Sequence, residues 1–275
     1  MTKTDYSFEQ IPAGWDAAAR FYDQHVASFT AKFARDAMDL VGVGPGQRVI
    51  DVAAGSGSLA LAAAQRGAEV LATDFAAGMV ELLREKAAKN GLTNLTAEVM
   101  DGQALGVPDA SFDRAFSVLG LMFFPDRKKG FAELARVLAP GGKAAVVAWS
   151  RPERMRVLGA FQGALWRALP DEALPLRPPP WLALTEPEQF KREMLEGGFR
   201  HVRVHTVSHV LVIDDPRTAF AWVTGATPAL DVMVHKLETA ERESLMQAFV
   251  EDVQAAQDGG PYGFEAEAHI AVGQR

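Results

Sequence analysis

The sequence of 275 residues contains no cysteine. This absence excludes disulfide bonds, thiolate nucleophiles, iron–sulfur clusters and cysteine-ligated zinc sites. It is consistent with a reducing compartment. A chain of this length buries roughly three quarters of its unfolded surface, so its core needs neither a covalent nor a metal cross-link.

The chain also has little basic character. It carries 28 Lys and Arg against 35 Asp and Glu, a formal charge of −7, and its sequence pI is near 5.4. The longest basic run is Arg127-Lys128-Lys129. Because proteins that follow a phosphate backbone need a basic surface, nucleic acid is not an expected partner.

Long apolar runs are missing as well. No stretch of eighteen apolar residues occurs, and the first ten residues, MTKTDYSFEQ, lack the apolar core of a signal peptide. We therefore expect no membrane span and a cytoplasmic protein that acts as a monomer or homodimer.

An apolar stripe with steps of three and four residues begins near the N-terminus and predicts one amphipathic helix over 13–41. Glycines between residues 42 and 46 end it. The members of the stripe are Trp15, Ala19, Tyr22, Val26, Phe29, Phe33, Ala37 and Leu40.

From residue 47 to 150, short apolar runs alternate with helical stretches. This alternation predicts an α/β domain with a doubly wound parallel sheet that is covered on both faces. The predicted strands are 48–53, 69–73, 95–100, 114–119 and 143–149, and the predicted helices are 59–65, 78–89 and 128–138.

The rest of the chain is less regular. We predict helices over 154–169, 185–197 and parts of 216–256, a stiff proline-rich loop over 170–181, and strands over 201–213 and 264–272. The expected organisation is an N-terminal helical lid (1–42), a ligand-binding core (43–150), a lid insertion with a helix (151–196), and C-terminal strands with a helical insertion that complete the sheet (197–275).

The most informative motif is the glycine turn in VIDVAAGSGS, residues 49–58, where a strand enters and a helix leaves. Glycines let the backbone approach a ligand closely, and a helix N-terminus favours electron-rich groups. The spacing G-x-G-x-x-A alone is also compatible with a dinucleotide site.

Carboxylates accompany three successive strands of this core. Asp51 lies inside the first strand, Asp74 ends the second, and Asp101 follows the third. Ligands of doubly wound sheets bind at the carboxyl ends of the strands. A carboxylate at the position of Asp74 can accept both hydroxyls of a ribose, and Asp51 can help to offset the charge of a cationic ligand.

Four stretches in this order resemble the class I S-adenosylmethionine-dependent methyltransferases, especially the ubiquinone/menaquinone C-methyltransferase branch. They are RVIDVAAGSGSLALAAA, EVLATDFAAGMVELLREKA, VMDGQALGVPDASFDRAFSVLGLMFFPD and ELARVLAPGGKAAVVAW, and they span about 47–150. The resemblance implies a Rossmann-like seven-stranded sheet of order 3-2-1-4-5-7-6 with the last strand antiparallel. It also implies S-adenosylmethionine as cofactor.

The resemblance further assigns roles to residues of this sequence. Ala53, Gly55 and Gly57 would line the methionine moiety, and Asp51 would order their loop. Asp74 would hold the ribose hydroxyls. The remaining cofactor contacts would come from Phe75, Met79, Asp101, Gly102 and Gln103 around the adenine, from Ser117 at the methionine end, and from Tyr22 of the lid.

Many members of the family carry histidine where this chain has Met122 or Phe123, so the resemblance supplies no base. We expect His25, beside Tyr22 and Phe29 on the lid helix, to be the candidate base. The acceptor is expected to be small and apolar or aromatic, methylated on oxygen, carbon or nitrogen as in secondary metabolism. Its predicted lining is Trp15, Met122, Trp149 and Trp181.

No metal site is predicted, because His201, His205 and His209 would spread along about 13 Å of one strand. Two other functions share the motifs. A nicotinamide-dependent oxidoreductase would use a related turn, but usually with a third glycine where Ala60 stands. A protein that binds S-adenosylmethionine without methylating anything would have the same binding residues.

Overall fold

The computed structural model describes residues 6–169, 180–257 and 259–275, so most of the predicted proline-rich loop lies outside the described residues. Seven strands form one sheet of order β3-β2-β1-β4-β5-β7-β6. β7 is antiparallel to β5 and β6, and the other neighbouring pairs are parallel. The predicted order and the antiparallel last strand are thus confirmed. The strands are β1 (Arg48–Val52), β2 (Glu69–Asp74), β3 (Leu95–Val99), β4 (Phe112–Val118), β5 (Leu138–Trp149), β6 (Arg200–Ile213) and β7 (Tyr262–Gln274).

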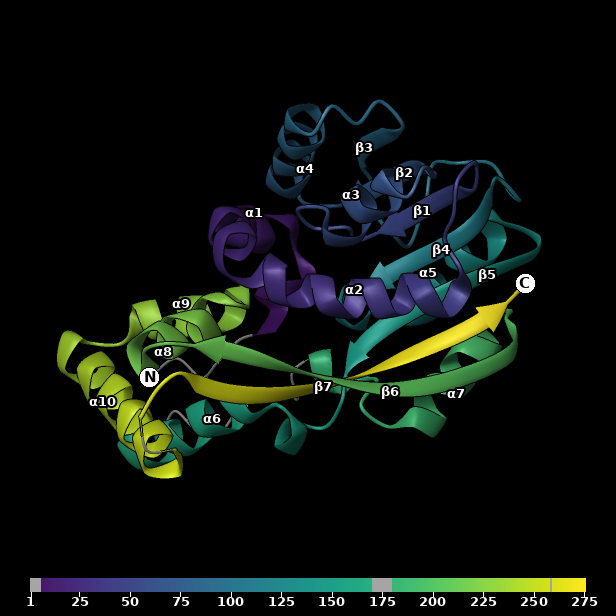
Figure 1. The fold of residues 1–275 in the computed structure, drawn as a ribbon. Coiled ribbons are helices and arrows are strands. Elements are labelled where there is room, and N and C mark those ends of the chain that lie inside the picture. The colour runs from purple at the N-terminus through teal and green to yellow at the C-terminus, as the bar shows by residue number, and fades with distance from the viewer. Residues whose placement is uncertain (1–5, 170–179, 258) are drawn as a thin grey trace.

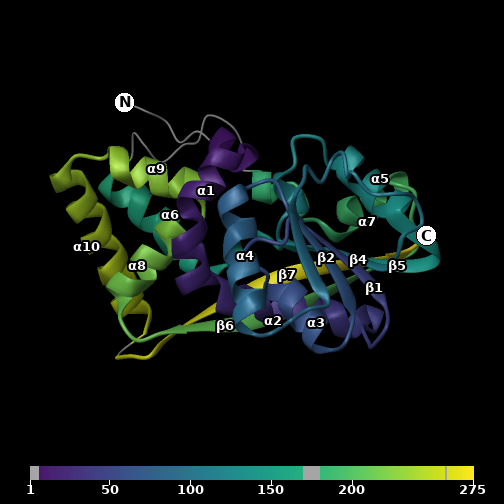
Figure 2. The same ribbon diagram turned by 90° about the horizontal axis from the view of Figure 1, so that it is seen from above.

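Helices cover both faces of the sheet. α2 (Ala27–Val41) and α3 (Ser58–Gln65) lie together on one face, and α5 (Arg127–Val137) and α7 (Pro187–Glu196) lie on the other (Figure 2). α4 (Ala77–Lys89) packs against β2 and β3. This double cover explains why the central strand β1 is buried along four of its five residues.

β6 and β7 extend beyond the sheet as a two-stranded ribbon that carries further helices (Figure 1). These are α8 (Pro216–Gly225), α9 (Pro228–Lys236) and α10 (Thr239–Ala256). α6 (Arg156–Ala168), which precedes β6 in the chain, packs against α8 and α10. Segments before and after β6 therefore build one helical lobe. None of the helices in the described ranges is long and apolar enough to cross a lipid bilayer.

The predicted N-terminal helix is present but interrupted. α1 (Pro12–Phe21) passes into one π-helical turn (Tyr22–Val26) before α2 begins, and a 3-10 turn (Tyr6–Gln10) precedes α1. A π turn inserts an extra residue and so changes which side chains face inward. Two contacts hold this turn: Asp23 pairs with Lys86 at 2.6 Å, and the His25 carbonyl accepts a hydrogen bond from Trp222 Nε1 at 2.9 Å.

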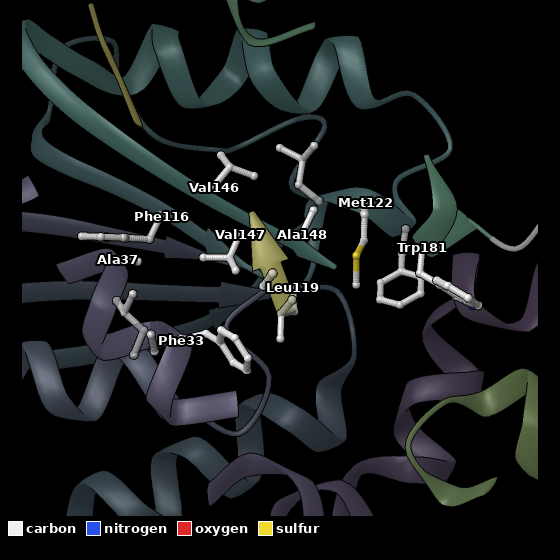
Figure 3. Close-up of a cluster of buried hydrophobic side chains, with 14 of the residues drawn as sticks. Phe33, Ala37, Phe116, Leu119, Met122, Val146, Val147, Ala148 and Trp181 are labelled. Atoms are coloured by element: carbon white, nitrogen blue, oxygen red, sulfur yellow. The ribbon is translucent and has the colours of Figure 1, made fainter. Parts of the chain in front are cut away.

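The core joins α2 to the central strands. Phe33 is fully buried, and its ring centroid lies 5.3 Å from that of Trp149 and 4.8 Å from that of His209. Figure 3 shows Phe33 and Ala37 on one side of the β5 valines, Met122 and Trp181 at one end of the cluster, and Leu119 between them. The apolar core thus reaches the loop that follows β4, which bounds the site described below.

The helix after that loop has a polar N-terminal cap. Asp126 accepts a hydrogen bond from the Lys129 amide at 3.1 Å at the start of α5. We expect Asp126→Ala to lower the free energy of unfolding by about 1 kcal/mol, because the Lys129 amide at the helix N-terminus then loses its hydrogen-bond acceptor. Urea denaturation measures this change, with the neighbouring exposed Lys128→Ala as control. An unchanged midpoint in Asp126→Ala would show that the cap does not stabilise the helix.

Candidate functional site

A cavity of about 460 Å³ lies at the carboxyl ends of β1, β2, β3 and β4. Its walls come from the loops after these strands, and the N-terminal 3-10 turn and α1 contribute Glu9, Pro12 and Trp15. We call it the first cavity. Four carboxyl groups, those of Glu9, Asp51, Asp74 and Asp101, line it, and no Lys, Arg or His is among its described lining residues. Its electrostatic character therefore favours a cation.

Asp74, the last residue of β2, is buried and hydrogen-bonded to the backbone on both sides. Its Oδ2 accepts from the Gly55 amide at 2.8 Å, and its Oδ1 accepts from the Ala76 amide at 2.9 Å. Burial raises the pKa of Asp74 to about 6, and the two amide hydrogen bonds oppose part of this shift. The carboxylate thus ties the glycine loop after β1 to the start of α4.

Asp51 is buried inside β1, 1% exposed, and lines the first cavity. Neither of its carboxylate oxygens has a hydrogen-bond partner within the described residues. Burial raises its pKa to about 8, the approach of the Ala60 amide opposes part of this shift, and the nearby Asp74 carboxylate adds to it. A buried carboxyl without a partner is costly, so its presence indicates a polar or cationic group that completes the site.

Two loops that line the cavity have unusual backbones. Ala53 has φ 57° and Leu119 has φ 57°, both in the left-handed region that residues with a side chain rarely adopt. A Cβ at Gly120 would lie 2.5 Å from the Ala53 Cβ, so only glycine lets these loops meet. Such strain is concentrated at functional sites, where the surrounding fold maintains it.

At the end of β3, Asp101 and Gln103 form a local hydrogen-bonded pair. The Asp101 carboxylate accepts from the Gln103 amide at 2.8 Å and from its side-chain Nε2 at 3.1 Å. Gln103 Oε1 in turn accepts from the Asp126 amide at 2.8 Å. Its second oxygen, Oδ2, also accepts from Gln103 Nε2 at 3.4 Å, and Asp101 is exposed and lines the first cavity.

A second, smaller cavity of about 70 Å³ adjoins the first. The two share Trp15, Tyr22, Thr30, Leu119 and Phe123 as lining residues. Among the described residues that line the second cavity, none is charged, and four are tryptophans: Trp15, Trp149, Trp181 and Trp222. A mostly apolar, aromatic pocket therefore opens beside an acidic one.

Most of the predicted site residues come together around these cavities. Ten of the twelve predicted cofactor-binding residues, all except Gly57 and Ser117, line the first cavity, and so does Trp15. These eleven are Trp15, Tyr22, Asp51, Ala53, Gly55, Asp74, Phe75, Met79, Asp101, Gly102 and Gln103. Met122, Trp149 and Trp181 line the second cavity, which Trp15 and Tyr22 also border.

Three predicted residues lie elsewhere. Gly57 has φ 93° and precedes α3, where a Cβ would lie 2.8 Å from Leu83, so its role is in the turn. Ser117 does not face either cavity: it is fully buried, and its Oγ accepts a hydrogen bond from the Leu121 amide at 3.1 Å. It fixes the loop after β4 instead.

His25 is the third, and its predicted place at the site needs correction. It is exposed on the π-helical turn, lines neither cavity, and its ring lies 4.6 Å from that of Phe21. The extra residue of the turn carries it away from the face on which Tyr22 lies. The geometry therefore offers no contact through which His25 could act as a base.

Several lining residues come from distant segments and were not revealed by the sequence motifs, among them Glu9, Trp222 and Thr227. Glu9 comes from the polar N-terminal segment, and Trp222 and Thr227 come from α8 and the start of α9. Their approach to the site depends on distant segments packing together, for which the local sequence gives no signal. Within the described part of the chain, no group of three His, Asp or Glu side chains is placed to hold a metal ion.

Comparison with known sequences identifies the family. A profile described as a methyltransferase domain matches residues 49–142. Demethylmenaquinone methyltransferase of Thermus thermophilus is 35% identical over 210 residues, covering 70% of this chain and 90% of that enzyme. Aklanonic acid methyltransferase DauC of a Streptomyces species is 31% identical over 196 residues, covering 70% and 83%.

A stronger but shorter match is an uncharacterized protein of Mycobacterium tuberculosis, 44% identical over 109 residues. The aligned region spans 40% of this chain and 39% of that protein.

Solved structures show the same fold. The YcgJ protein of Bacillus subtilis superposes with a TM-score of 0.56 at 20% identity, covering 88% of this chain and 97% of that one. A phosphoethanolamine N-methyltransferase of Haemonchus contortus with bound S-adenosylhomocysteine gives a TM-score of 0.55 at 18% identity, covering 89% and 52%. The two enzymes matched over most of their lengths, together with the sheet order, show that the chain belongs to the class I S-adenosylmethionine-dependent methyltransferases, whose cofactor is S-adenosylmethionine.

Proposed function

We propose that the protein transfers the methyl group of S-adenosylmethionine to a small apolar or aromatic acceptor bound in the second cavity. The observation that carries this proposal is the junction of the two cavities at Trp15, Tyr22, Leu119 and Phe123. A methyl donor in the first cavity and an acceptor in the second would meet there. Such alignment supplies much of the catalysis of a bimolecular displacement.

The residues of the first cavity fit this cofactor. Its volume lies within the range of small-molecule sites. The Asp74 carboxylate is placed to accept ribose hydroxyls, and the unpartnered Asp51 carboxyl offers a partner for positive charge. A nicotinamide dinucleotide would bring a negatively charged pyrophosphate toward four carboxyl groups, which argues against the oxidoreductase alternative.

The second cavity supports an apolar acceptor. Its aromatic walls exclude water and offer ring faces and edges against which an aromatic molecule can stack. One of the related enzymes is named for a quinone acceptor, demethylmenaquinone. The volume of about 70 Å³ favours a single ring or the reacting end of a larger molecule.

The bound cofactor supplies a methyl group that is already activated by a cationic sulfur. The chain's own residues then have to position the two reactants and exclude water. Trp15 from α1 closes the junction from the lid: its Nε1 donates to the Glu9 carbonyl at 3.0 Å, and its ring packs 5.3 Å from that of Phe123. This packing holds an apolar wall beside the place where the methyl group would pass.

A screen of phenols, quinols and amines with S-adenosylmethionine labelled in its methyl group tests the proposal. We expect label to appear in at least one aromatic acceptor, with release of S-adenosylhomocysteine. Tight binding of S-adenosylmethionine without transfer to any class would instead indicate a binding protein that does not methylate.

The two cavities predict a separation of kinetic effects. Trp181 is buried and lines only the second cavity. We expect Trp181→Ala to raise the KM for the acceptor about tenfold, because an aromatic wall is lost, while the Kd for S-adenosylmethionine changes less than twofold. Steady-state kinetics and calorimetry measure the two values. An equal loss of affinity for donor and acceptor would contradict the separate roles of the cavities.

A further inference from the structure

Tyr22 and Thr30 form a hydrogen-bonded pair at the junction of the two cavities. The Tyr22 hydroxyl donates to Thr30 Oγ1 at 3.3 Å, and both residues line the first cavity as well as the second. The Tyr22 ring also borders the glycine loop after β1, because its Cε1 would lie 4.0 Å from a Cβ at Gly55. The pair therefore reaches from the cofactor side to the side on which the methyl acceptor is placed.

The π-helical turn of the lid brings these two side chains onto one face. Eight residues of regular α-helix would separate their directions by about 80°, whereas one residue absorbed by a π turn reduces this angle to about 20°. Tyr22 is the first residue of the turn, and Thr30 lies in α2, which follows it. The extra residue that turns His25 away from the site thus also creates the pair.

The surroundings of Thr30 determine the direction of its hydrogen bonds. Thr30 Oγ1 donates its single proton to the Ala27 carbonyl at 3.2 Å, and a carbonyl oxygen can only accept. Thr30 Oγ1 therefore accepts from Tyr22, and this bond occupies the one hydroxyl proton of the tyrosine. Tyr22 can offer a ligand only a lone pair on its oxygen.

The Tyr22 hydroxyl also keeps its proton at neutral pH. Burial raises its pKa, the hydrogen bond with Thr30 opposes part of this shift, and the Asp74 carboxylate adds to it. The hydroxyl is thus a neutral hydrogen-bond acceptor and does not serve as a base.

The other hydroxyls of the second cavity are less available to a ligand. Those in its described lining belong to Tyr22, Thr30 and Thr227. Thr30 is only 3% exposed, and Thr227 Oγ1 is buried and approaches the Glu9 carboxyl. Tyr22 is partly exposed. Its oxygen is therefore the hydroxyl oxygen that a molecule at the junction can meet.

We propose that Tyr22 selects the methyl acceptor by taking a hydrogen bond from an O–H or N–H group on its ring, and that Thr30 sets this polarity by holding the tyrosine proton. This inference rests on the proposed function. It narrows the substrates to aromatic molecules that donate a hydrogen bond, such as phenols, quinols and aromatic amines. An aryl ether would place its lone pairs against those of Tyr22 and be disfavoured.

Phenol and anisole are suitable probes, because each carries one oxygen on a single ring and only phenol can donate a proton from it. Their binding to the protein loaded with S-adenosylhomocysteine can be followed by the fluorescence of the four tryptophans that line the second cavity. We expect the wild-type protein to prefer phenol about tenfold, the effect of one neutral hydrogen bond. The difference in size between the probes cancels when their preference is compared between variants.

Two variants should abolish the preference in opposite ways. Tyr22→Phe keeps the ring and loses the oxygen, so the affinity for phenol should fall about tenfold, to that for anisole. Thr30→Val leaves Tyr22 free to donate, so the affinity for anisole should rise about tenfold, to that for phenol. The Ala27 carbonyl keeps its hydrogen bond from Ser58 Oγ, at 3.1 Å, in this variant. Thr30→Ser retains the hydroxyl and should behave as wild type.

Cofactor binding and a matched control complete the test. Tyr22→Phe should leave the Kd for S-adenosylmethionine within threefold of wild type, because the hydroxyl serves the methyl acceptor. Tyr262→Phe, the same change at a buried residue of β7 that lines neither cavity, should alter none of these values. Circular dichroism of each variant checks that it is folded.

The outcomes separate the two proposals. Equal wild-type affinities for the two probes, an unchanged preference in Tyr22→Phe, or an equal loss of both affinities in Thr30→Val overturns the inference and leaves the proposed function intact. A tenfold loss of S-adenosylmethionine affinity in Tyr22→Phe with normal phenol preference assigns the hydroxyl to the cofactor and also overturns it. Failure of the wild type to bind phenol or anisole, or to methylate any member of the screen, contradicts the proposed function and with it the role of Tyr22.

Discussion

Replacing Asp74 by asparagine is expected to lower the affinity for S-adenosylmethionine about 100-fold. The carboxylate accepts one hydrogen bond from the Gly55 amide and one from the Ala76 amide, so each oxygen keeps a lone pair for the ribose. Asparagine must place its NH₂ group where one carboxylate oxygen was, and an NH₂ group cannot accept a hydrogen bond. The variant therefore loses one charge-assisted hydrogen bond from a backbone amide and one from the ribose. Each is worth about 1.5–3 kcal/mol.

Calorimetric titration with S-adenosylmethionine and with S-adenosylhomocysteine measures this loss. Asp101→Asn is the matched control, because its carboxylate is exposed and already shared with Gln103, and we expect a loss of less than tenfold. Burial raises the pKa of Asp74 to about 6, so wild-type affinity should decline as the pH falls through 6, whereas that of Asp74→Asn should not. Equal affinities of Asp74→Asn and wild type would remove Asp74 from the proposed site.

Asp51→Asn is expected to stabilise the protein without cofactor while weakening cofactor binding at least tenfold. Burial raises the folded-state pKa of Asp51 from 3.8 to about 8. The folded state therefore holds the proton more tightly than the unfolded state, and the free energy of unfolding falls as the pH rises from about 4 toward 8. The neutral asparagine side chain removes this penalty but leaves its own buried amide without hydrogen bonds. The net increase in the free energy of unfolding is about 2 kcal/mol at pH 8.

Scanning calorimetry between pH 5 and 9 tests the prediction. The variant should melt about 5 °C above wild type at pH 8, and the difference should shrink as the pH approaches 5. Saturating S-adenosylmethionine should narrow the difference by at least about 1.4 kcal/mol, because a complex that is tenfold weaker gains that much less stabilisation from the ligand. A variant that melts below wild type at pH 8 would show that a partner already satisfies the Asp51 carboxylate.

Much of the fold follows from signals that are local in the sequence. Each strand from β1 to β5 contains a short apolar run, and a helix follows β1, β2, β4 and β5 in the chain. Because right-handed crossovers restrict the possible topologies, the resemblance and these runs suffice to predict the sheet order. Asp51, Asp74 and Asp101 are brought together for the same reason, since strands that run parallel end at one edge.

The lid could not be predicted in this way. An apolar stripe over 13–41 cannot reveal that one π turn shifts its phase at Tyr22, and this shift separates Tyr22 from His25. The position of Glu9 depends on the packing of the N-terminal turn against α9, a contact between segments more than two hundred residues apart in the chain. The hydrogen bond of Ser117 likewise depends on a loop geometry that strand periodicity does not encode.

The ribbon formed by β6 and β7 lets different segments of the chain shape the donor side and the acceptor side of the proposed reaction. The loops that follow β1 to β4 shape the donor side, whereas Trp222, Val223 and Leu230 reach the acceptor side from helices inserted between the last two strands. Exchange of residues 216–236 between relatives would therefore vary the acceptor side while the loops after β1 to β4 stay unchanged, an evolutionary freedom that a site built from a single chain segment would lack.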